Sequence, residues 1–402
     1  MHNRRIPTLI AVLMVVLMAT VPALGGAATA GIATSTADTG AVETGAGANA
    51  APAVDSSSQQ ACTFPYTATD ATGTDVTLEE KPERVTTLNP SAAQTMWEIG
   101  GKSQVVGLSQ FALYLEGADS RTNVSASGFG VSIEKVVGTN PDLVLAPNAT
   151  STETVASLRD AGLTVFHFSS STTIEDVSEK TTRIGRLTGN CEGAAETNAW
   201  MNANVETASE ATANVEDVRV LYPLGGGYIA GSNTFISAML DSAGGANVAA
   251  ERNLSGYPQI NDEVVLELAP EYLVITGYSS YLVEQEPYLS IPAVKNNNTV
   301  QVNRNWMNQP APRSVVMGVR TLTRGFHPEA AAEVDFETRA EAVAAMETPT
   351  PTPTATATST TTDAMTESTA ESESTSASGP GFGVALTIAT LAGLSVLLTR
   401  RE

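Results

Sequence analysis

The hydrophobic pattern of this chain contains a repeated unit. The segment VSIEKVVGTNPDLVLA at residues 131–146 returns as INDEVVLELAPEYLVITG at residues 260–277. In each copy, apolar residues at helical spacing follow a glutamate, and a proline ends the helical pattern. The run of consecutive apolar residues that follows fits a strand buried on both faces. Each copy therefore predicts a short amphipathic helix that leads into a buried strand.

The two copies belong to a longer repeat. Aligned without a gap, Glu134 falls on Glu263, and residues 84–88 and 219–223 supply an opening strand in each copy. The spacing far exceeds the roughly 20 to 50 residues of a solenoid unit. Alternating strands and helices that occur twice predict two α/β lobes with parallel sheets. The loops at the carboxyl ends of the strands should face each other across a crevice, the usual position of a ligand in such sheets.

Composition sets the two ends of the chain apart. Residues 1–30 predict a signal peptide, with a basic start, an apolar core and small residues at a cleavage site. Residues 31–61 contain mostly Ala, Gly, Ser and Thr and predict a flexible tether. Residues 347–378 form an acidic Thr/Pro/Ser-rich linker, and residues 379–402 carry an apolar run with a basic end. We therefore expect an exported chain that is held at the membrane by its C-terminus.

Between these ends we expect an N-terminal lobe at 62–171, a connecting helix at 172–216 and a C-terminal lobe at 217–346. Apolar residues at helical spacing predict the connecting helix, and Thr172 and Glu175 predict a capping box at its start. A helix between two lobes is a stiff spacer. Large closure of the crevice is therefore not expected.

The sequence contains two cysteines, Cys62 and Cys191. An exported protein meets an oxidising environment, so we expect a disulfide between them, with two free thiols as the alternative. The bond would tie the start of the first lobe to the segment between the lobes. In the entropic model, closing so long a loop stabilises a fold by about 4 to 5 kcal/mol.

The chain is strongly acidic. It has 21 Lys and Arg against 43 Asp and Glu, for a net charge of −22. This balance excludes a general nucleic-acid binder, which needs a basic face. An acidic surface with few lysines is typical of proteins that stay hydrated in concentrated salt, which indicates a halophilic source. Candidate glycosylation sites are Asn123, Asn148, Asn253 and Asn297.

The sequence offers no catalytic constellation. His167 lies in an apolar strand pattern and is best explained as a packed histidine, while His327 precedes Pro328 at a helix end, where a cation suits the helix dipole. Two distant histidines and a pair of bridged cysteines do not make a transition-metal site. Phosphate-loop and nucleophile-elbow motifs are absent from the sequence. We therefore expect a protein that is not an enzyme and uses no metal and no cofactor.

Aromatic side chains gather in loops that follow predicted strands. They are Phe111, Tyr114 and Phe129 in the first lobe, and Tyr228, Tyr257, Tyr278, Tyr281 and Trp306 in the second. Aromatic residues make up only 5% of the chain, so core packing alone does not explain their concentration at one end of both sheets. Together they predict a large, weakly charged ligand pocket with flat walls.

A series of short motifs runs through the predicted lobes. It comprises KPERV at 81–85, NPS at 89–91, SIE at 132–134, PDLV at 141–144, QPAPR at 309–313 and FHPE at 326–329. As a set and in this order, they resemble the substrate-binding proteins of ABC importers for cobalamin and iron-siderophores. The resemblance implies two α/β lobes joined by one long helix, in a protein that is monomeric when free. It also implies two partners, a membrane permease and its ATPase.

The resemblance further implies roles for individual residues. Glu134 and Glu263 would lie at the outer tips of the two lobes and dock onto arginines of the permease. Arg313, in the QPAPR motif, would contact the ligand. The PGF sequence at 380–382, followed by an apolar run and arginines, resembles the archaeal sorting signal that is removed and replaced by a lipid.

These features favour a surface-anchored protein that captures cobalamin and passes it to an importer. Many aromatic and amide side chains, with few candidate cations, suit a corrinoid that carries neutral amides. A ferric siderophore or haem, which is commonly anionic, is the alternative ligand. A structural cell-surface domain is a further alternative, but it leaves the aromatic crevice unexplained.

Overall fold

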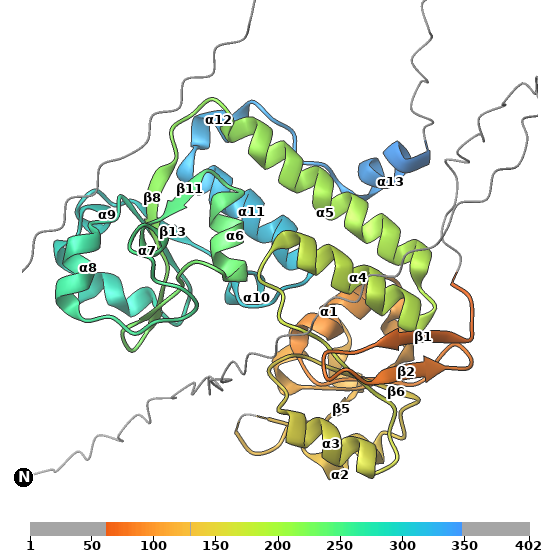
Figure 1. Ribbon diagram of the computed structural model, residues 1–402. Coiled ribbons are helices and arrows are strands. Elements are labelled where there is room, and N and C mark those ends of the chain that lie inside the picture. Colours follow the sequence, from red (N-terminus) through yellow and green to blue (C-terminus); the bar gives the residue numbers. More distant parts are fainter. Residues whose placement is uncertain (1–61, 129, 348–402) are drawn as a thin grey trace, which may run out of the picture. The chain divides into compact units, whose positions relative to one another are not determined.

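The computed structural model describes residues 62–128 and 130–347 (Figure 1). The predicted features outside these ranges are the signal peptide at 1–30, the tether at 31–61, Phe129, the sorting segment at 379–402 and all of the linker after Glu347. Within the described ranges, no helix combines the length and the apolar character that crossing a membrane requires.

The first lobe contains a five-stranded parallel sheet with the strand order β5-β4-β3-β6-β7. Its strands are β3 (Val85–Thr87), β4 (Val105–Leu108), β5 (Thr122–Asn123), β6 (Leu143–Ala146) and β7 (Val165–His167). All four residues of β6 are buried. Leu143 and Leu145 pack into one hydrophobic core, and Val144 and Ala146 pack into another. As its apolar run predicts, β6 is covered on both faces.

The second lobe repeats this arrangement with four parallel strands in the order β11-β8-β12-β13. They are β8 (Val218–Leu221), β11 (Gly245–Asn247), β12 (Tyr272–Ile275) and β13 (Thr299–Gln301). β8 takes the place of β3 and β12 takes the place of β6, as the sequence repeat predicts. The first sheet differs by its additional edge strand, β5. The prediction of two α/β lobes with parallel sheets is confirmed.

Helices and turns follow the strands in both lobes (Figure 1). In the first lobe the helices are α1 (Pro90–Glu98), α2 (Ile133–Gly138) and α3 (Thr152–Asp160). In the second they are α6 (Phe235–Asp241), α7 (Val248–Glu251), α8 (Asp262–Leu268), α9 (Pro292–Lys295), α10 (Arg304–Met307), α11 (Pro312–Phe326) and α12 (Pro328–Ala332). Two antiparallel hairpins complete the lobes, β1 (Tyr66–Thr69) with β2 (Asp75–Leu78), and β9 (Pro223–Gly225) with β10 (Tyr228–Ile229).

Residues 172–216 form two helices, α4 (Ile174–Thr188) and α5 (Cys191–Thr212), and not one continuous helix. Gly189 ends α4 with a φ of 68°, a left-handed conformation that glycine adopts without steric cost. α11 and the C-terminal helix α13 (Arg339–Glu347) both pack against α5. Among the described residues, the 22-residue α5 is the longest helix, and α4 is a separate helix before it.

The start of α4 differs from the sequence-based prediction by one position. The capping box consists of Thr173 and Asp176, and not Thr172 and Glu175. The carboxylate of Asp176 accepts hydrogen bonds from the backbone N–H groups of both Thr172 and Thr173, which places the negative charge at the helix start. These bonds also hold the pKa of Asp176 below its usual value, although partial burial acts in the opposite direction.

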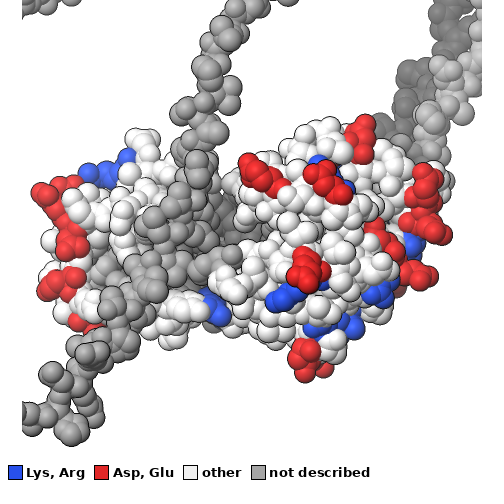
Figure 2. Space-filling view, turned by 90° about the horizontal axis from the view of Figure 1, so that it is seen from below, with Lys and Arg blue, Asp and Glu red and all other residues white. Residues whose placement is uncertain are grey.

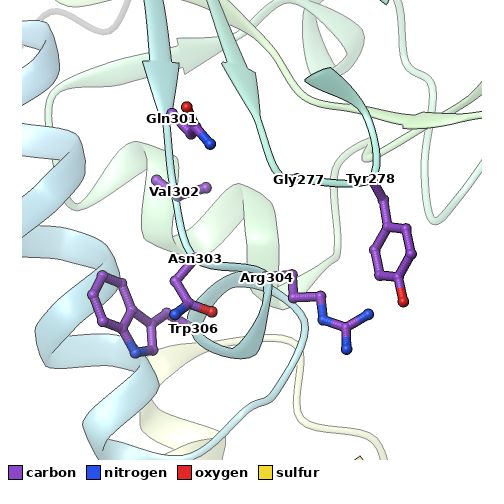
Figure 3. Close-up of a pocket in the computed structure, with 7 residues that line it drawn as sticks. All are labelled: Gly277, Tyr278, Gln301, Val302, Asn303, Arg304 and Trp306. Carbon is purple, nitrogen blue, oxygen red and sulfur yellow. The ribbon is translucent and has the colours of Figure 1, made fainter. Parts of the chain in front are cut away.

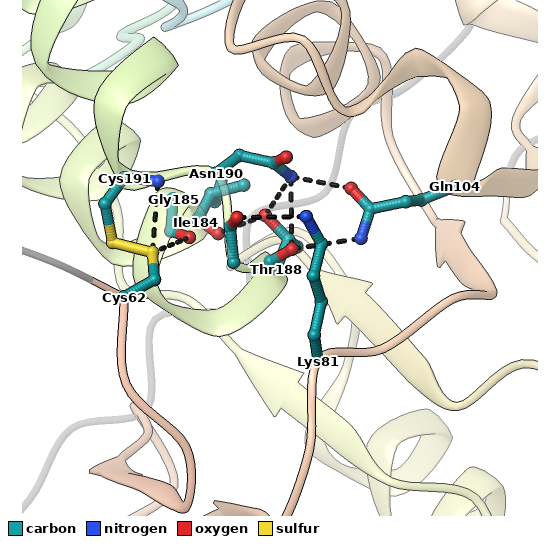
Figure 4. The surroundings of a disulfide bond; sticks show 9 residues. Cys62, Lys81, Gln104, Ile184, Gly185, Thr188, Asn190 and Cys191 are labelled. Atoms are coloured by element: carbon teal, nitrogen blue, oxygen red, sulfur yellow. Dashed lines mark hydrogen bonds between the residues drawn. A yellow bond between two sulfur atoms is a disulfide. The ribbon is translucent and has the colours of Figure 1, made fainter.

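The predicted disulfide between Cys62 and Cys191 is present, with 5.6 Å between the Cα atoms (Figure 4). Beside it, the Lys81 ammonium donates to the carbonyl of Gly189. The amide of Asn190 donates to the side-chain oxygen of Gln104, whose own amide donates to the carbonyl of Thr188. The disulfide and these bonds together fix the turn between α4 and α5 against the first lobe.

Equivalent arginines anchor equivalent helices in the two lobes, α2 in the first and α8 in the second. In the first lobe Arg84 donates to the carbonyls of Thr139 and Asn140, which follow α2. In the second lobe Arg219 donates to the carbonyls of Leu268 and Ala269 at the end of α8. A guanidinium satisfies unpaired carbonyls at a helix C-terminus and interacts favourably with the helix dipole. The repeat therefore extends to the hydrogen bonds that hold α2 and α8 in place.

Candidate functional site

The candidate site is an open pocket of about 590 Å³ in the second lobe. Its lining consists of Gly277, Tyr278, Gln301, Val302, Asn303, Arg304 and Trp306 (Figure 3). Gln301 is the last residue of β13, and the other six follow the carboxyl end of β13 or of its parallel neighbour β12. The pocket therefore lies at the edge of the sheet where the sequence predicts ligand binding.

A helix cap at Asn303 shapes the lining of the pocket. The Asn303 side chain accepts a hydrogen bond from the backbone N–H of Asn305 and begins α10 directly after β13. This tight turn brings Arg304 and Trp306 onto the pocket wall. Gln301 and Asn303 add amide groups to the lining. The wall therefore combines flat aromatic faces with donors and acceptors of hydrogen bonds.

Arg304 and Tyr278 form a stacked pair in this pocket. The guanidinium carbon of Arg304 lies 4.4 Å from the centre of the Tyr278 ring, a favourable cation–π geometry. Tyr278 is 65% exposed, so most of its ring is open to solvent. In Figure 3 both side chains extend from neighbouring loops at the strand ends. The pair offers a flat surface with positive charge.

Of the nine predicted ligand contacts, the structure brings Tyr278 and Trp306 together in this pocket. Three other tyrosines of the second lobe, Tyr228, Tyr257 and Tyr281, do not line it. The Tyr281 hydroxyl lies so close to Gly225 that a Cβ there would approach to 3.2 Å. Tyr257 is 48% exposed, on the loop before α8.

Sequence reasoning missed Arg304, Gln301 and Asn303. Polar residues at a strand end carry no periodic signal, and the prediction of a weakly charged pocket gave no weight to a lone arginine. Their positions at or just after the carboxyl end of β13 are the available signal, because such positions line the ligand edge of a parallel sheet.

In the first lobe, Phe111 lies on a short 3-10 turn after β4 and is 41% exposed. Tyr114 follows, and its hydroxyl is already hydrogen-bonded within the protein. Its hydroxyl accepts a hydrogen bond from Gln94 at 2.7 Å and donates one to Gln309 at 2.6 Å. Burial raises the pKa of the Tyr114 phenol, so it stays protonated and able to donate. Tyr114 therefore joins α1 of the first lobe to the segment before α11.

The same region contains Arg313. Its guanidinium forms an ion pair with Glu98, which is 7% exposed and also paired with Arg339. Burial raises the pKa of Glu98, and the two arginines oppose that shift. The side-chain oxygen of Gln94 accepts hydrogen bonds from the backbone N–H and the hydroxyl of Ser314. The guanidinium of Arg313, which is expected to contact the ligand, therefore already neutralises a buried carboxylate.

The two histidines of the described residues, His167 and His327, take structural positions. The Nε2 atom of His167 lies 3.1 Å from the carbonyl oxygen of Thr150, and that of His327 lies 2.8 Å from the carbonyl oxygen of Gly244. Both rings are buried. Among the described residues, no group of His, Cys, Asp or Glu side chains is arranged to hold a metal ion.

Glu134 and Glu263 occupy matching positions in α2 and α8. Each is the second residue of its helix and each is exposed. Within the described ranges, neither carboxylate takes part in an ion pair. The two glutamates therefore present free negative charge on separate lobes, and they lie outside the lining of the pocket.

Fold and site together define a two-lobed ligand-binding protein. The profile of the periplasmic binding proteins matches residues 85–304, and the chain belongs to this family. It is similar to the cobalamin-binding protein of Halobacterium salinarum, with 47% identity over 69% of this chain and 78% of that protein. It is also similar to the vitamin B12-binding protein of Vibrio parahaemolyticus, with 25% identity over 60% of this chain and 88% of that protein.

Solved structures share the fold. The apo form of the periplasmic heme-binding protein RhuT from Roseiflexus sp. RS-1 matches with a TM-score of 0.56 and 23% identity, over 62% of this chain and 99% of that chain. The Helicobacter pylori CeuE structure with Ni-His matches with a TM-score of 0.59 and 19% identity, over 67% of this chain and 91% of that chain. At these identities, the likeness establishes the fold alone.

Proposed function

We propose that this chain is the substrate-binding component of an ABC importer, and that it captures cobalamin outside the cell and delivers it to the permease and its ATPase. The similarity to the Halobacterium salinarum cobalamin-binding protein, which spans most of both chains, carries this proposal. The cobalamin is cargo, so the protein needs no resident cofactor.

The pocket fits a large flat ligand with polar edges. Tyr278 and Trp306 offer ring faces against which a macrocycle can bury apolar area. Gln301 and Asn303 offer amide groups that can pair with the amides of a corrinoid. The aromatic residues elsewhere at the strand ends would extend this wall, including Phe111 and the tyrosines of the second lobe.

Arg304 favours a second candidate function, the capture of haem or an anionic ferric siderophore. A guanidinium stacked on Tyr278 is a natural partner for a carboxylate. Cobalamin remains preferred because Arg304 is the one cation in the described lining, whereas amide and aromatic groups make up most of the remaining side chains.

Delivery requires a partner at the membrane. We assign the contacts with the permease to Glu134 and Glu263, whose exposed carboxylates occupy equivalent positions on the two lobes. Export through the segment at 1–30, anchoring through the C-terminal segment and a monomeric free state complete the proposal. Mass spectrometry of the mature chain tests the anchor, since loss of the C-terminal segment together with the added mass of a lipid indicates that a lipid replaces it.

Titration of the purified chain with cobalamin, haem and an anionic ferric catecholate siderophore, followed by calorimetry, tests the choice of ligand. We expect saturable binding of cobalamin, with much weaker binding of the other two. The variant Arg304→Gln separates the candidates further, because it should weaken an anionic ligand much more than cobalamin. Preferential binding of haem or of the anionic siderophore by the unmodified chain would replace cobalamin as the cargo.

A further inference from the structure

The helices that carry Glu134 and Glu263 share more than their glutamates. Val137 in α2 and Leu266 in α8 fall one turn after the glutamate in each lobe, at equivalent positions of the repeat. Both are large aliphatic side chains that face solvent, with 40% and 46% of their surface exposed. Residues three apart lie on the same side of a helix, so each glutamate has an exposed apolar neighbour.

This exposure is part of the repeat and not an accident of one loop. In α2, Val136 is buried beside the exposed Val137, and in α8, Val265 is buried beside the exposed Leu266. Each helix therefore already turns apolar side chains to its core, Val136 in α2 and Val265 with Leu268 in α8, and still keeps Val137 or Leu266 outside. An isolated exposed aliphatic residue needs no explanation, but the same exposure beside the same charge in both lobes indicates a shared contact surface.

The surface is also held firmly. The guanidinium groups of Arg84 and Arg219 bind the carbonyls at the ends of α2 and α8, so each helix is tied to the strand that begins the parallel sheet of its own lobe. A fixed surface loses little conformational entropy when a partner binds to it.

We propose that Val137 and Leu266 are apolar docking contacts for the permease, and that each pairs with its neighbouring glutamate to form one of two equivalent docking surfaces. This inference rests on the proposed importer function. The fitting partner is a protein with two equivalent sites, each an apolar hollow beside a cation. The free carboxylates of Glu134 and Glu263 supply the charge complement for those cations.

Salt gives the apolar side chains a particular role. At molar ionic strength, screening acts over about 3 Å, so exposed ion pairs contribute little to affinity. Burial of apolar surface is maintained or strengthened by salts that are excluded from protein surfaces. For a chain with a net charge of −22, which suits concentrated salt, Val137 and Leu266 would carry much of the docking affinity. The glutamates would select the partner and orient it.

The test measures binding of the full chain to membrane vesicles that contain the importer, with vesicles lacking it as the blank. We expect the double variant Val137→Ala/Leu266→Ala to bind about tenfold more weakly, from the apolar area that it removes. The loss should persist at molar salt, whereas the loss caused by Glu134→Ala/Glu263→Ala should shrink. Val215→Ala is the matched control, because Val215 is 39% exposed but has no place in the repeated helices.

Three outcomes decide the inference. Unchanged vesicle binding by the apolar double variant, with loss in the glutamate variant, overturns it and leaves the glutamate contacts intact. Loss of cobalamin affinity in the isolated apolar variant also overturns it, because the side chains would then serve the ligand. Should the double variant fold poorly, Val137→Thr keeps the side-chain shape and must still weaken vesicle binding. If the unmodified chain binds haem and not cobalamin, the cargo changes while the vesicle comparison still stands.

Discussion

Two tyrosines at strand ends of the two lobes have different surroundings. Tyr278 in the second lobe is 65% exposed and stacks with Arg304 in the pocket. Tyr114 in the first lobe has its hydroxyl held between Gln94 and Gln309. The sequence predicts one role for both, as walls of a ligand pocket. Their hydrogen-bond partners, and not their residue type, separate a ring that is available to a ligand from a ring that joins the lobes.

Four residues form what we call the polar bridge between the lobes. They are Gln94 and Tyr114 on the first lobe and Gln309 and Ser314 on the second. Gln94 is fully buried at its centre. A buried polar network of this kind is costly to break, because each partner that is left unpaired keeps its desolvation penalty.

The largest expected effect follows from removing the centre of the polar bridge. Gln94→Ala leaves the backbone N–H of Ser314 without its acceptor and removes the bond that Gln94 donates to the Tyr114 hydroxyl, which still donates to Gln309. The free energy of unfolding should therefore fall by about 2 to 4 kcal/mol. Chemical denaturation measures this change in the free energy of unfolding. Gln285→Ala, at an exposed position, is the control and should change stability by less than about 0.5 kcal/mol. Equal stability of both variants would show that the bridge is not formed in solution.

In the pocket, a substitution should change ligand affinity and leave the free energy of unfolding almost unchanged. Tyr278→Ala should weaken cobalamin binding by about 1 to 3 kcal/mol, as buried aromatic anchors do, with little change in stability because the ring is exposed. Tyr278→Phe keeps the ring face and should bind almost normally. Calorimetry measures both affinities. A large loss in the Phe variant would assign the contact to the hydroxyl and not to the ring.

The repeat could be predicted from the sequence because it is local. A glutamate, a helical apolar pattern, a proline and an apolar run specify α2 with β6, and α8 with β12, without reference to the rest of the chain. The positions of Tyr278 and Trp306 in loops at strand ends could be predicted for the same reason, since each follows a predicted strand. The turn at Gly189 that divides α4 from α5 was not identified, although its glycine was visible.

The polar bridge could not be predicted. Gln94 and Ser314 are 220 positions apart, and their hydrogen bond exists only because the chain returns α11 to the side of α1. A glutamine inside a helical pattern gives no sign that it will be buried. The ion pair between Glu98 and Arg313 also joins residues that are far apart in the sequence. The family motif predicts a ligand contact for Arg313, and nothing in the sequence indicates that this arginine pairs with a carboxylate.

A smaller effect is expected from removing the Tyr114 hydroxyl alone. Tyr114→Phe removes two hydrogen bonds but keeps the ring, so the free energy of unfolding should fall by about 1 to 2 kcal/mol. Cobalamin affinity should change less than in Tyr278→Ala. Denaturation and calorimetry on the same preparations compare the two variants directly. If Tyr114→Phe lost affinity and kept its stability, Tyr114 would belong to the pocket after all.

The smallest expected change, measured over one pH unit, concerns Lys180. This side chain of α4 donates to the carbonyl of Pro310, next to Gln309 of the polar bridge. Burial lowers the pKa of Lys180 from 10.5 to about 7, and the nearby Asp176 carboxylate only partly opposes the shift. Between about pH 7 and 10.5 the unfolded chain binds a proton that the folded chain does not. Stability should therefore rise with pH across this window, by at most about 1.4 kcal/mol per pH unit.

Below about pH 7 both states bind the proton, so Lys180 should add no slope there. Lys180→Met removes the titrating group and keeps the apolar length of the side chain. The difference between the denaturation curves of this variant and of the unmodified chain isolates the contribution of Lys180, because all other titrating groups are common to both. If the two chains show the same pH dependence between pH 7 and 10, the ammonium is solvated in solution. The contact between Lys180 of α4 and the carbonyl of Pro310 would then not form in solution.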